Sequence, residues 1–549
     1  MKKIIIAVLF SVSQLFVFGQ KPEDNMISEM HTITVDADNP LGEVYNLWDV
    51  RVINAPELWG KPGFAEKIKA TTKHINYINS IRALGGKHNG ECEWFKGVDD
   101  KGEPICDFEP FIAYIKAQRS VGFTPWIVLD NVPNKMSNNY KHQYGNTSPP
   151  DDYDVWFKYI QQFVSALVDE FGMDEVSTWR FRVGTEPDLF PGHWSGTKEQ
   201  FFKHYDYTVA AVESIIENPW IGPGNMLMWN GTQEGQKGGR WGFEILKHCA
   251  EGTNYYTEET GTRIDYFSQS VYAWSPKPFL YEENMKKVRA EIAKYPSLKN
   301  IELEIHEYGE LNECLSRGDA LSNTEFFVGL YAHTIDVAYK YNVRRIYNWD
   351  QHLGMITTYD QIVEGLFQPW VNIMDCLSLM ENGERVAVLK DAQKQIKFGT
   401  IAAWKDGNLY ALVYSHHDDA NQETENTMEL TFVGDRIGSS KTWSIKEQLL
   451  DKDHGVYIHQ LYKDIEAAGI APKDTKFYLQ RNIARRYGDE NQETTTAIIE
   501  KNLQKYQDIG KMKVVKSEEF IKTVNNKLEM KVDIHGSGFH FIKLTPVAD

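Results

Sequence analysis

The sequence of 549 residues has few cysteines, no cluster of basic residues and, after its N-terminus, no long apolar run. The five cysteines stand at positions 92, 106, 249, 314 and 376, without the spacing of metal ligands, so we expect no metal site. Their odd number leaves at least one thiol free unless it pairs between chains. A disulfide between Cys92 and Cys106, the closest pair, stays open as an alternative.

The shortage of positive charge excludes one class of partner. Lysine and arginine number 59 against 77 aspartates and glutamates, which gives a formal net charge of −18. Such a surface repels phosphate backbones, so nucleic acid is not an expected partner. The missing apolar runs predict no membrane span in the mature chain. Aromatic residues are abundant instead, at 13%, and they suit both a core and stacking against sugar rings.

Residues 1–19 have the pattern of a secretory signal peptide. Lys2 and Lys3 precede an apolar stretch, residues 4–18, that is short for a membrane span, and Gly19 supplies a small residue before the expected cleavage point. No cysteine follows that would anchor a lipoprotein. We therefore expect a chain exported to a periplasm or beyond.

From residue 20 to residue 385, short apolar stretches alternate with amphipathic helices. In the stretch 154–172, aromatic and aliphatic residues recur at helical spacing. Strand candidates lie at 43–50, 79–86, 123–130, 178–185, 220–228, 264–274, 300–309 and 343–350. Strands that alternate with helices over this length predict an α/β fold, a (β/α)8 TIM barrel whose active site lies at the carboxyl ends of its strands.

After residue 385 the pattern changes to strands separated by turns. Strand-like segments at 386–391, 396–417 and 428–434 are followed by a helical region and by a last strand pair at 527–546. We expect an accessory C-terminal β-sandwich over 386–549 that carries helical insertions. The alternating stretch 31–39 precedes the barrel and is a candidate strand of that sandwich.

Two glutamates stand where predicted barrel strands end. Glu186 follows the fourth strand in WRFRVGTEPD, and Glu307 ends the seventh in NIELEIHEYG. These strand ends can face each other across the barrel mouth, and two opposed carboxylates are what glycoside hydrolysis requires. One must arrive protonated and donate to the leaving oxygen, and the other must arrive ionised and attack the anomeric carbon. Placing them close couples their titrations and raises one pKa.

Each of these glutamates has a structural alternative. Glu186 could cap a loop, although its position at a strand end favours catalysis. Three neighbours compete with Glu307 for the second role: Glu302, Glu304 and Glu310. Glu304 lies inside the predicted strand and Glu310 lies past the turn glycine, so we assign the role to Glu307.

At these two motifs the sequence resembles the clan A glycoside hydrolases, and among them family 39, which includes β-xylosidases and α-L-iduronidases. The resemblance assigns the acid/base role to Glu186 in WRFRVGTEP and the nucleophile role to Glu307 in HEYG. Further stretches are similar in order, at 123–133, 264–274, 344–350 and 451–469. The resemblance implies a retaining mechanism that needs no cofactor.

The sequence departs from the family pattern around the sugar. Where the family has an Asn that contacts the substrate 2-hydroxyl, this chain has Thr185, and the Trp before that Asn is Gly184. A His of the sixth strand is replaced by Ser270, and His306 precedes the nucleophile. Because these positions border subsite −1, we expect a sugar that differs from simple xylose, such as an algal galactan unit or a uronic acid.

Further residues at strand ends are candidates for sugar contacts, each with an alternative as a turn or core residue. The candidate substrate-binding residues are Thr185, His88, Asn89, Asn131, Tyr272, Trp274, His306, Trp349 and Asp350, and Asp130 is considered with them. Tyr272 is also placed to hydrogen-bond the nucleophile. The candidate partners of an acidic group are Arg182, Lys87 and His306, and for Arg182 a paired structural cation inside the barrel is the favoured alternative.

Taken together, these patterns predict a secreted retaining glycoside hydrolase, exo-acting on a modified sugar of a plant or algal polysaccharide or oligosaccharide. Two alternatives stay open: an endo-acting glycanase of the same clan, and an inactive barrel that only binds glycans. Product sizes from a polysaccharide digest would distinguish the first, and turnover of any glycoside would exclude the second. The sequence sets neither the sugar and linkage nor the oligomeric state.

Overall fold

The computed structural model describes residues 26–53, 55–88, 90–137, 141–142, 144–227, 241–273, 277–310, 324–348, 355–358, 361–473 and 487–547. The predicted signal peptide, residues 1–19, lies outside these ranges. Among the helices of the described ranges, none combines the length and the apolar character needed to cross a bilayer.

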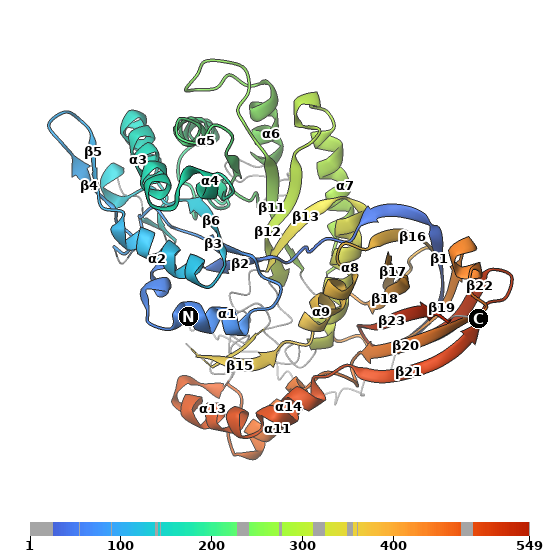
Figure 1. The fold of residues 1–549 in the computed structure, drawn as a ribbon. Helices are drawn as coiled ribbons and strands as arrows, with labels where there is room; N and C mark the ends of the chain where they lie inside the picture. Colours follow the sequence, from blue (N-terminus) through green and yellow to red (C-terminus); the bar gives the residue numbers. More distant parts are fainter. Residues whose placement is uncertain are drawn as a thin grey trace, which may run out of the picture.

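Eight parallel strands of the described chain form a barrel, which fills the upper part of Figure 1. They are β2 (Val50–Ile53), β3 (Tyr77–Ser80), β6 (Thr124–Leu129), β9 (Arg180–Val183), β10 (Trp220–Pro223), β11 (Tyr266–Ala273), β12 (Glu302–Glu310) and β13 (Val343–Asn348). The first five pair in one sheet and the last three in another. Met226 joins β10 to β11 through two 3.0 Å backbone hydrogen bonds, and a 2.8 Å bond from Ile346 N–H to Leu47 C=O joins β13 to the segment before β2.

A helix follows each barrel strand and packs on its outer side. These helices are α1 (Phe64–Thr71), α2 (Glu109–Ser120), α3 (Tyr153–Phe171), α5 (Lys198–Glu213), α6 (Trp241–Glu251), α7 (Tyr281–Ile292), α8 (Thr324–Lys340) and α9 (Val371–Met380). Helix α3 shows why such a segment forms: Asp152 caps its first turn by accepting from the N–H groups of Asp154 and Val155, and its apolar stripe is buried. The predicted TIM barrel is confirmed.

The first predicted strand, 43–50, was wrong in position, because β2 begins only where that stretch ends. The Asn46 side chain accepts a 2.9 Å hydrogen bond from Trp48 N–H, which bends the chain instead of extending it. Val44, Leu47 and Trp48 are buried, and the Trp48 ring stacks on Tyr331 of α8 at 5.5 Å. The apolar residues that resembled a strand are therefore buried because they pack against α8.

A nine-stranded sheet forms the second part of the molecule, at the lower right of Figure 1. Its strands are β1 (Ile27–Glu43), β16 (Glu384–Lys390), β17 (Lys397–Lys405), β18 (Asn408–His416), β19 (Thr424–Val433), β20 (Thr442–Leu450), β21 (Lys513–Lys522), β22 (Lys527–His535) and β23 (Gly538–Pro546). β1 lies between β16, to which it is antiparallel, and β19, to which it is parallel. A separate apolar core, with residues from β1, β17, β19, β20, β22 and β23, fills the interior of the resulting sandwich.

Two strands of this sheet were not predicted from the sequence. β20 alternates imperfectly, since several of its consecutive residues are buried, and β21 is exposed along most of its length because it lies at the sheet edge. Neither pattern has the clean period of two that marks a half-buried strand. Cys92 and Cys106 are both free thiols, so the disulfide left open above is not formed.

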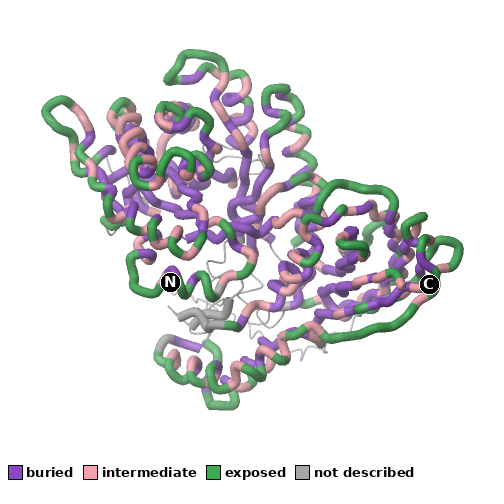
Figure 2. Tube along the Cα trace, in the orientation of Figure 1, coloured by how far each residue is buried: buried purple, intermediate pink, exposed green. Residues whose placement is uncertain are grey.

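Helix α8 holds the barrel against the sandwich by packing on β17, β18 and β23. A methyl group added at Gly329 of α8 would lie 2.6 Å from the Ser415 carbonyl oxygen, so the helix and β18 are in close contact. The Tyr414 hydroxyl of β18 donates a 2.8 Å hydrogen bond to Asp336 of α8. In Figure 2 the buried segments include the barrel strands and continue through this junction into the sheet.

The predicted helical insertion leaves the sandwich after β20. It contains α11 (Ile458–Ala467), α13 (Gln492–Lys501) and α14 (Leu503–Ile509), which share a small apolar core. The Tyr457 hydroxyl donates a 2.7 Å hydrogen bond to the Phe367 carbonyl oxygen of β15 (Gln361–Phe367), which follows β13. The insertion is thereby fixed to a loop of the barrel.

Candidate active site

Glu186 lies just beyond the carboxyl end of β9, in a turn that a backbone hydrogen bond closes. Its φ angle is +39°, an uncommon value for a residue with a side chain, and such backbone is frequent at functional sites. Gly184, two residues earlier, has a φ of +81°, a conformation that favours glycine. The Glu186 carbonyl accepts a 2.9 Å bond from Leu189 N–H, so the turn is closed. The carboxyl group is held over the barrel mouth.

Glu307 reaches the same mouth because β12 contains a bulge. In the pairing of β11 with β12, Gln269 is opposite Ile305 but Ser270 is opposite Glu307, so His306 is the extra residue. A strand without this bulge would direct alternate residues to opposite faces, and Glu307 would then be on the other side from Glu304. The bulge brings Glu307 back to the barrel interior at its carboxyl end.

The two carboxyl groups are buried together, each residue being 5% exposed. Burial raises the pKa of Glu186 well above its usual value, and the neighbouring Glu307 raises it further. Burial also raises the pKa of Glu307. Two adjacent carboxyl groups in a dry site do not both ionise readily, so the pair retains one proton at a higher pH than a free carboxyl group does.

The surroundings decide which member of the pair keeps that proton. The Tyr272 hydroxyl donates a 2.7 Å hydrogen bond to Glu307 Oε2. This bond, the Arg182 guanidinium, Asn225 and the more distant Arg82 all lower the pKa of Glu307 and oppose the effect of burial. For Glu186 the lowering effect of the Ser270 hydroxyl is opposed by the raising effects of Glu307 and Asp188. The proton therefore resides on Glu186, and Glu307 is the ionised member.

A chain of hydrogen bonds runs beneath Glu186 and includes Thr185. The Thr185 hydroxyl donates to Asp130 at 2.7 Å and accepts from Arg182 at 2.9 Å. Asp130 also accepts a 2.6 Å bond from Arg82 N–H. The threonine hydroxyl is thus engaged in both directions, and it serves to hold Asp130 and Arg182 in place. Arg182 is buried, and its hydrogen bonds reach the Thr185 hydroxyl and the His306 ring, so it contacts the barrel interior; a structural role for this cation stays a prediction.

His306, predicted to contact the sugar, is wholly buried inside the barrel. One ring nitrogen lies 2.7 Å from Glu304 Oε2, and the other accepts a 3.4 Å bond from Arg182. Burial, reinforced by Arg182, lowers the pKa of His306 well below its usual value, so the ring is neutral. The ring contacts Glu304 and Arg182 inside the barrel and has no exposed surface, so the prediction of a substrate contact is wrong.

The competing glutamates of β12 serve the barrel interior. Glu304 is buried, and its carboxylate lies 3.0 Å from Arg180 and 3.5 Å from Arg345. Glu302 pairs with the same two arginines. These bonds give both residues a structural role, and they favour Glu307 as the reactive carboxylate of the strand.

The other residues predicted to contact the sugar differ in where they lie. Tyr272 lies against Glu307, and Asn131 follows β6 with its side chain donating to the Tyr144 carbonyl at 2.9 Å. His88 is exposed. Four predicted residues lie outside the described ranges: Asn89, Trp274, Trp349 and Asp350. Lys87, a candidate partner for an acidic group, pairs with Glu57 at 2.6 Å and Glu91 at 3.3 Å.

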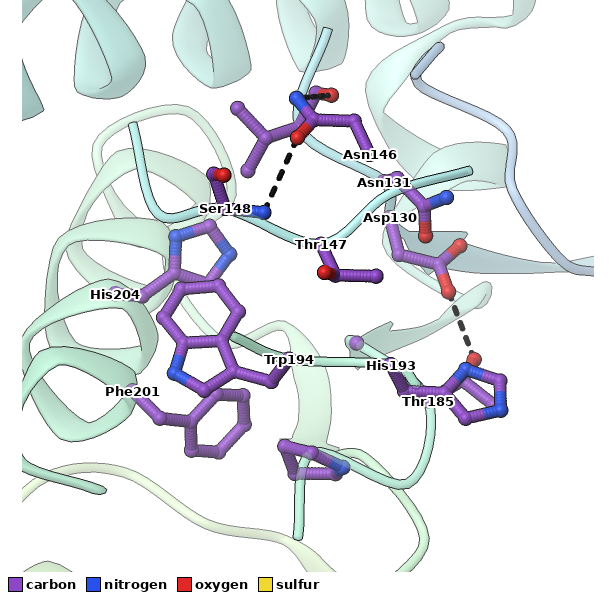
Figure 3. A pocket seen from close by; sticks show the side chains of 13 residues that line it. Asp130, Asn131, Asn146, Thr147, Ser148, Thr185, His193, Trp194, Phe201 and His204 are labelled. Atoms are coloured by element: carbon purple, nitrogen blue, oxygen red, sulfur yellow. Dashed lines mark hydrogen bonds between the residues drawn. The ribbon is translucent and has the colours of Figure 1, made fainter. Parts of the chain in front are cut away.

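A pocket adjoins Glu186 on the side of β6 (Figure 3). The loop after β6 contributes Asp130 and Asn131, and the loop after β9 contributes Thr185 and His193, while His204 closes the far side. Burial lowers the pKa of His204 to about 3, so its ring is neutral. The pocket borders the loop that carries Glu186, and Glu307 does not line it.

Three residues near the pair were not identified from the sequence: Asn225, Tyr144 and His193. The Asn225 side chain donates a 2.7 Å bond to Ser270, and it follows β10, so the rule that sites lie at strand ends could have found it. Tyr144 and His193 lie in two different loops, and their rings stack with centroids 4.2 Å apart. Loops of this kind have no periodic pattern, and no signal in the sequence pairs these two.

Sequence comparison finds relatives over the barrel. The model of the family described as Glycosyl hydrolases family 39 matches residues 31–317. An alpha-1,4-L-rhamnosidase from Formosa agariphila is 28% identical over 233 residues, which are 41% of this chain and 43% of the relative. A beta-xylosidase from Geobacillus stearothermophilus is 27% identical over 224 residues, 38% of this chain and 42% of the relative. The matches thus span less than half the length of either relative.

Structural comparison extends over nearly the whole chain. A bacterial orthologue of human α-L-iduronidase superposes with a TM-score of 0.68, covering 95% of this chain and 84% of that structure at 13% sequence identity. At so low an identity the similarity concerns the fold alone. It supports the predicted arrangement of a TIM barrel with an accessory sandwich.

Proposed function

The chain belongs to glycosyl hydrolase family 39, and from this we propose that it hydrolyses glycosidic bonds with retention of anomeric configuration. The observation that carries the proposal is the unequal surroundings of the two buried carboxyl groups. Glu307 accepts from Tyr272 and lies near Arg182, whereas Glu186 is next to the charge of Glu307 and keeps its proton. This is the division between acid and nucleophile that double displacement needs.

In the first step Glu186 donates its proton to the glycosidic oxygen while a Glu307 carboxylate oxygen attacks the anomeric carbon. The bond between that carbon and the leaving oxygen breaks, the aglycone departs as an alcohol, and a glycosyl ester forms on Glu307. In the second step the ionised Glu186 takes a proton from water as the water oxygen attacks the same carbon. The ester bond breaks, and both carboxyl groups return to their starting states.

The sugar is proposed to be neutral and different from xylose. Thr185 replaces an amide that could hold a 2-hydroxyl, and its hydroxyl is engaged by Asp130 and Arg182. The three residues suggested as partners of an acidic group have other contacts, since Arg182 and His306 are buried and Lys87 pairs with Glu57 and Glu91. The relative named a rhamnosidase makes a terminal α-L-rhamnose unit of a plant or algal saccharide the first choice, because that sugar is uncharged and has an axial 2-hydroxyl.

We expect an aryl α-L-rhamnoside to be hydrolysed with a kcat/KM at least about tenfold above that of an aryl β-xyloside, the size of effect that one altered sugar contact produces. The measurement is a panel of chromogenic glycosides that also includes an α-L-iduronide. Proton NMR of the first-formed anomer reports retention. Oligosaccharide products of many sizes from a polymer digest would favour the endo-acting alternative instead.

Two variants of Thr185 serve as controls for this preference. Thr185→Ser keeps the hydroxyl between Asp130 and Arg182 and is expected to behave as the unchanged protein. Thr185→Asn restores the amide and is expected to shift the preference toward xylosides. Efficient cleavage of xylosides by the unchanged protein, with no gain in Thr185→Asn, would contradict the proposed sugar.

We also propose export, on the pattern of residues 1–19. The full-length chain produced in a bacterial host is expected to appear outside the cytoplasm with its N-terminus at or near Gln20. N-terminal sequencing of the exported protein measures this. A cytoplasmic chain that retains Met1 would contradict it.

A further inference from the structure

His193 lies beside the acid/base candidate, although no sequence motif marks it. Its Nε2 is 3.5 Å from Glu186 Oε2, and its side chain is 8% exposed. Hydrogen bonds of catalytic groups are often long in an empty site and shorten in the complex. The distance therefore allows direct hydrogen bonding between the imidazole and this carboxyl oxygen.

The position of the His193 ring is fixed from several sides. Its backbone N–H donates a 2.9 Å bond to the Leu189 carbonyl, and the next residue but one, Ser195, donates a 2.8 Å bond to the Thr147 carbonyl. Between them Trp194 is buried, and its indole N–H donates to the Thr197 carbonyl at 3.0 Å. The imidazole itself stacks on Tyr144 with an interplanar angle of 12°. A ring held this way is an orienting group rather than a mobile side chain.

The two oxygens of Glu186 have different partners, and this separates their roles. Oε1 accepts from the Ser270 hydroxyl, whose own oxygen accepts a 2.7 Å bond from the Asn225 side chain. Because the hydroxyl proton is directed at Oε1, the acidic proton of Glu186 belongs on Oε2. Oε2 is the atom that faces His193. The carboxyl oxygen that gives up and regains the proton, Oε2, is thus the oxygen next to the imidazole.

We propose that His193 is a positioning residue for Glu186: its imidazole donates Nε2–H to Oε2 whenever that carboxyl is ionised, between the two chemical steps. The inference rests on the proposed function and adds a residue to it. No proton is transferred to or from His193, since the proton that Glu186 loses to the leaving oxygen returns from the attacking water. The bond favours the carboxylate that must act as base in the second step.

Other charged groups around this contact contribute to the same titration. Glu307 and Asp188 act on Glu186 in the opposite sense, since both raise its pKa. Arg82 lies over the Tyr144 ring, 5.2 Å from its centroid, and Arg182 and Asp130 are hydrogen-bonded to Thr185. Substitutions at His193 leave all of these in place, so a change in pH dependence can be assigned to the lost N–H donor.

The test is a pair of variants that separate the donor from the stacked ring. His193→Phe keeps a ring against Tyr144 and removes the donor, while His193→Gln keeps an N–H near the Nε2 position and removes the ring. Without the donor the carboxylate is less favoured, so we expect the alkaline limb of kcat/KM in His193→Phe to move up by about one pH unit, the effect of one hydrogen bond to a charged group. His193→Gln is expected to keep the limb of the unchanged protein.

Two results would overturn the proposal: an unshifted limb in His193→Phe, or a shift in His193→Gln as large as in His193→Phe. The second result would assign the effect to ring stacking. Failure of the proposed function is a distinct outcome, seen as an unchanged protein without turnover on any glycoside. In that case infrared titration of the Glu186 carboxyl band, assigned by its loss in Glu186→Gln, still shows whether His193→Phe raises the pKa.

Discussion

Replacing Glu307 by glutamine is expected to lower turnover by roughly four to six orders of magnitude, since an amide is a poor nucleophile and the other groups of the site cannot replace it. Initial rates on the best glycoside of the panel measure the loss. The fold is expected to remain, because glutamine has the same shape and removes a charge that burial disfavours. Thermal unfolding should therefore show a melting temperature at least as high as that of the unchanged protein.

Two further variants make the assignment of Glu307 specific. Glu302→Gln changes a glutamate of the same strand that pairs with Arg180 and Arg345, and it is expected to retain activity. In Glu307→Gly, azide is expected to take the vacated place and convert an activated aryl glycoside into a glycosyl azide of inverted configuration. Hydrolysis by Glu307→Gln at the rate of the unchanged protein would remove this residue from the mechanism and leave Glu310 as the candidate on β12.

Replacing Glu186 by alanine is expected to give the second largest effect, and one that depends on the leaving group. For a natural saccharide or an alkyl glycoside, loss of the general acid should cost about 10²- to 10⁴-fold in kcat/KM. An aryl glycoside with a very good leaving group needs little protonation, so its first step should be nearly unaffected. Its second step still lacks a base, and the glycosyl ester on Glu307 should accumulate as a burst followed by slow release, visible by mass spectrometry of the intact protein.

The pH profile provides an independent check on Glu186. In the unchanged protein Glu186 must be protonated, and its raised pKa keeps it so to a higher pH than a free glutamic acid; activity then falls as the pH rises through that pKa. In Glu186→Ala with an activated substrate this alkaline limb is expected to disappear. Added azide should attack the glycosyl ester and release a glycosyl azide of retained configuration. Equal losses for good and poor leaving groups would contradict the role of general acid.

How far the sequence predicted this site can be judged from β9 and β12. Glu186 was found because it follows a strand of clear apolar pattern, and strand ends collect at one face of a barrel. The resemblance to family 39 places His306 at the sugar because it directly precedes the nucleophile, and this prediction is wrong because the ring is wholly buried. A family pattern gives the order of residues but not the position of a bulge, and β12 inserts one extra residue at His306. The sequence of β12 alone does not predict the bulge, because the bulge arises from the pairing of Glu307 with Ser270 on β11.

The support around the carboxyl pair shows a second limit. Thr185 was identified as a departure from the family pattern, yet its partners Asp130 and Arg182 lie on different strands, and no local pattern links them. His193 and Tyr144 lie in loops that meet only because the barrel closes. Such contacts depend on tertiary packing, so residue types at strand ends can be predicted from sequence while the hydrogen bonds that tune them cannot.

The position of β1 in the sandwich has a consequence for how the chain becomes a folded molecule. β1 is among the first described segments to be synthesised, but both of its neighbours, β16 and β19, come more than three hundred residues later. Until they emerge, a strand with a buried apolar face has no partner and is open to pairing with other chains. Closing so long a loop also costs conformational entropy, although that cost grows slowly with length. The accessory domain is consequently discontinuous, and an expression fragment cut at residue 386 would lack a central strand of its sheet and expose two edges in its place.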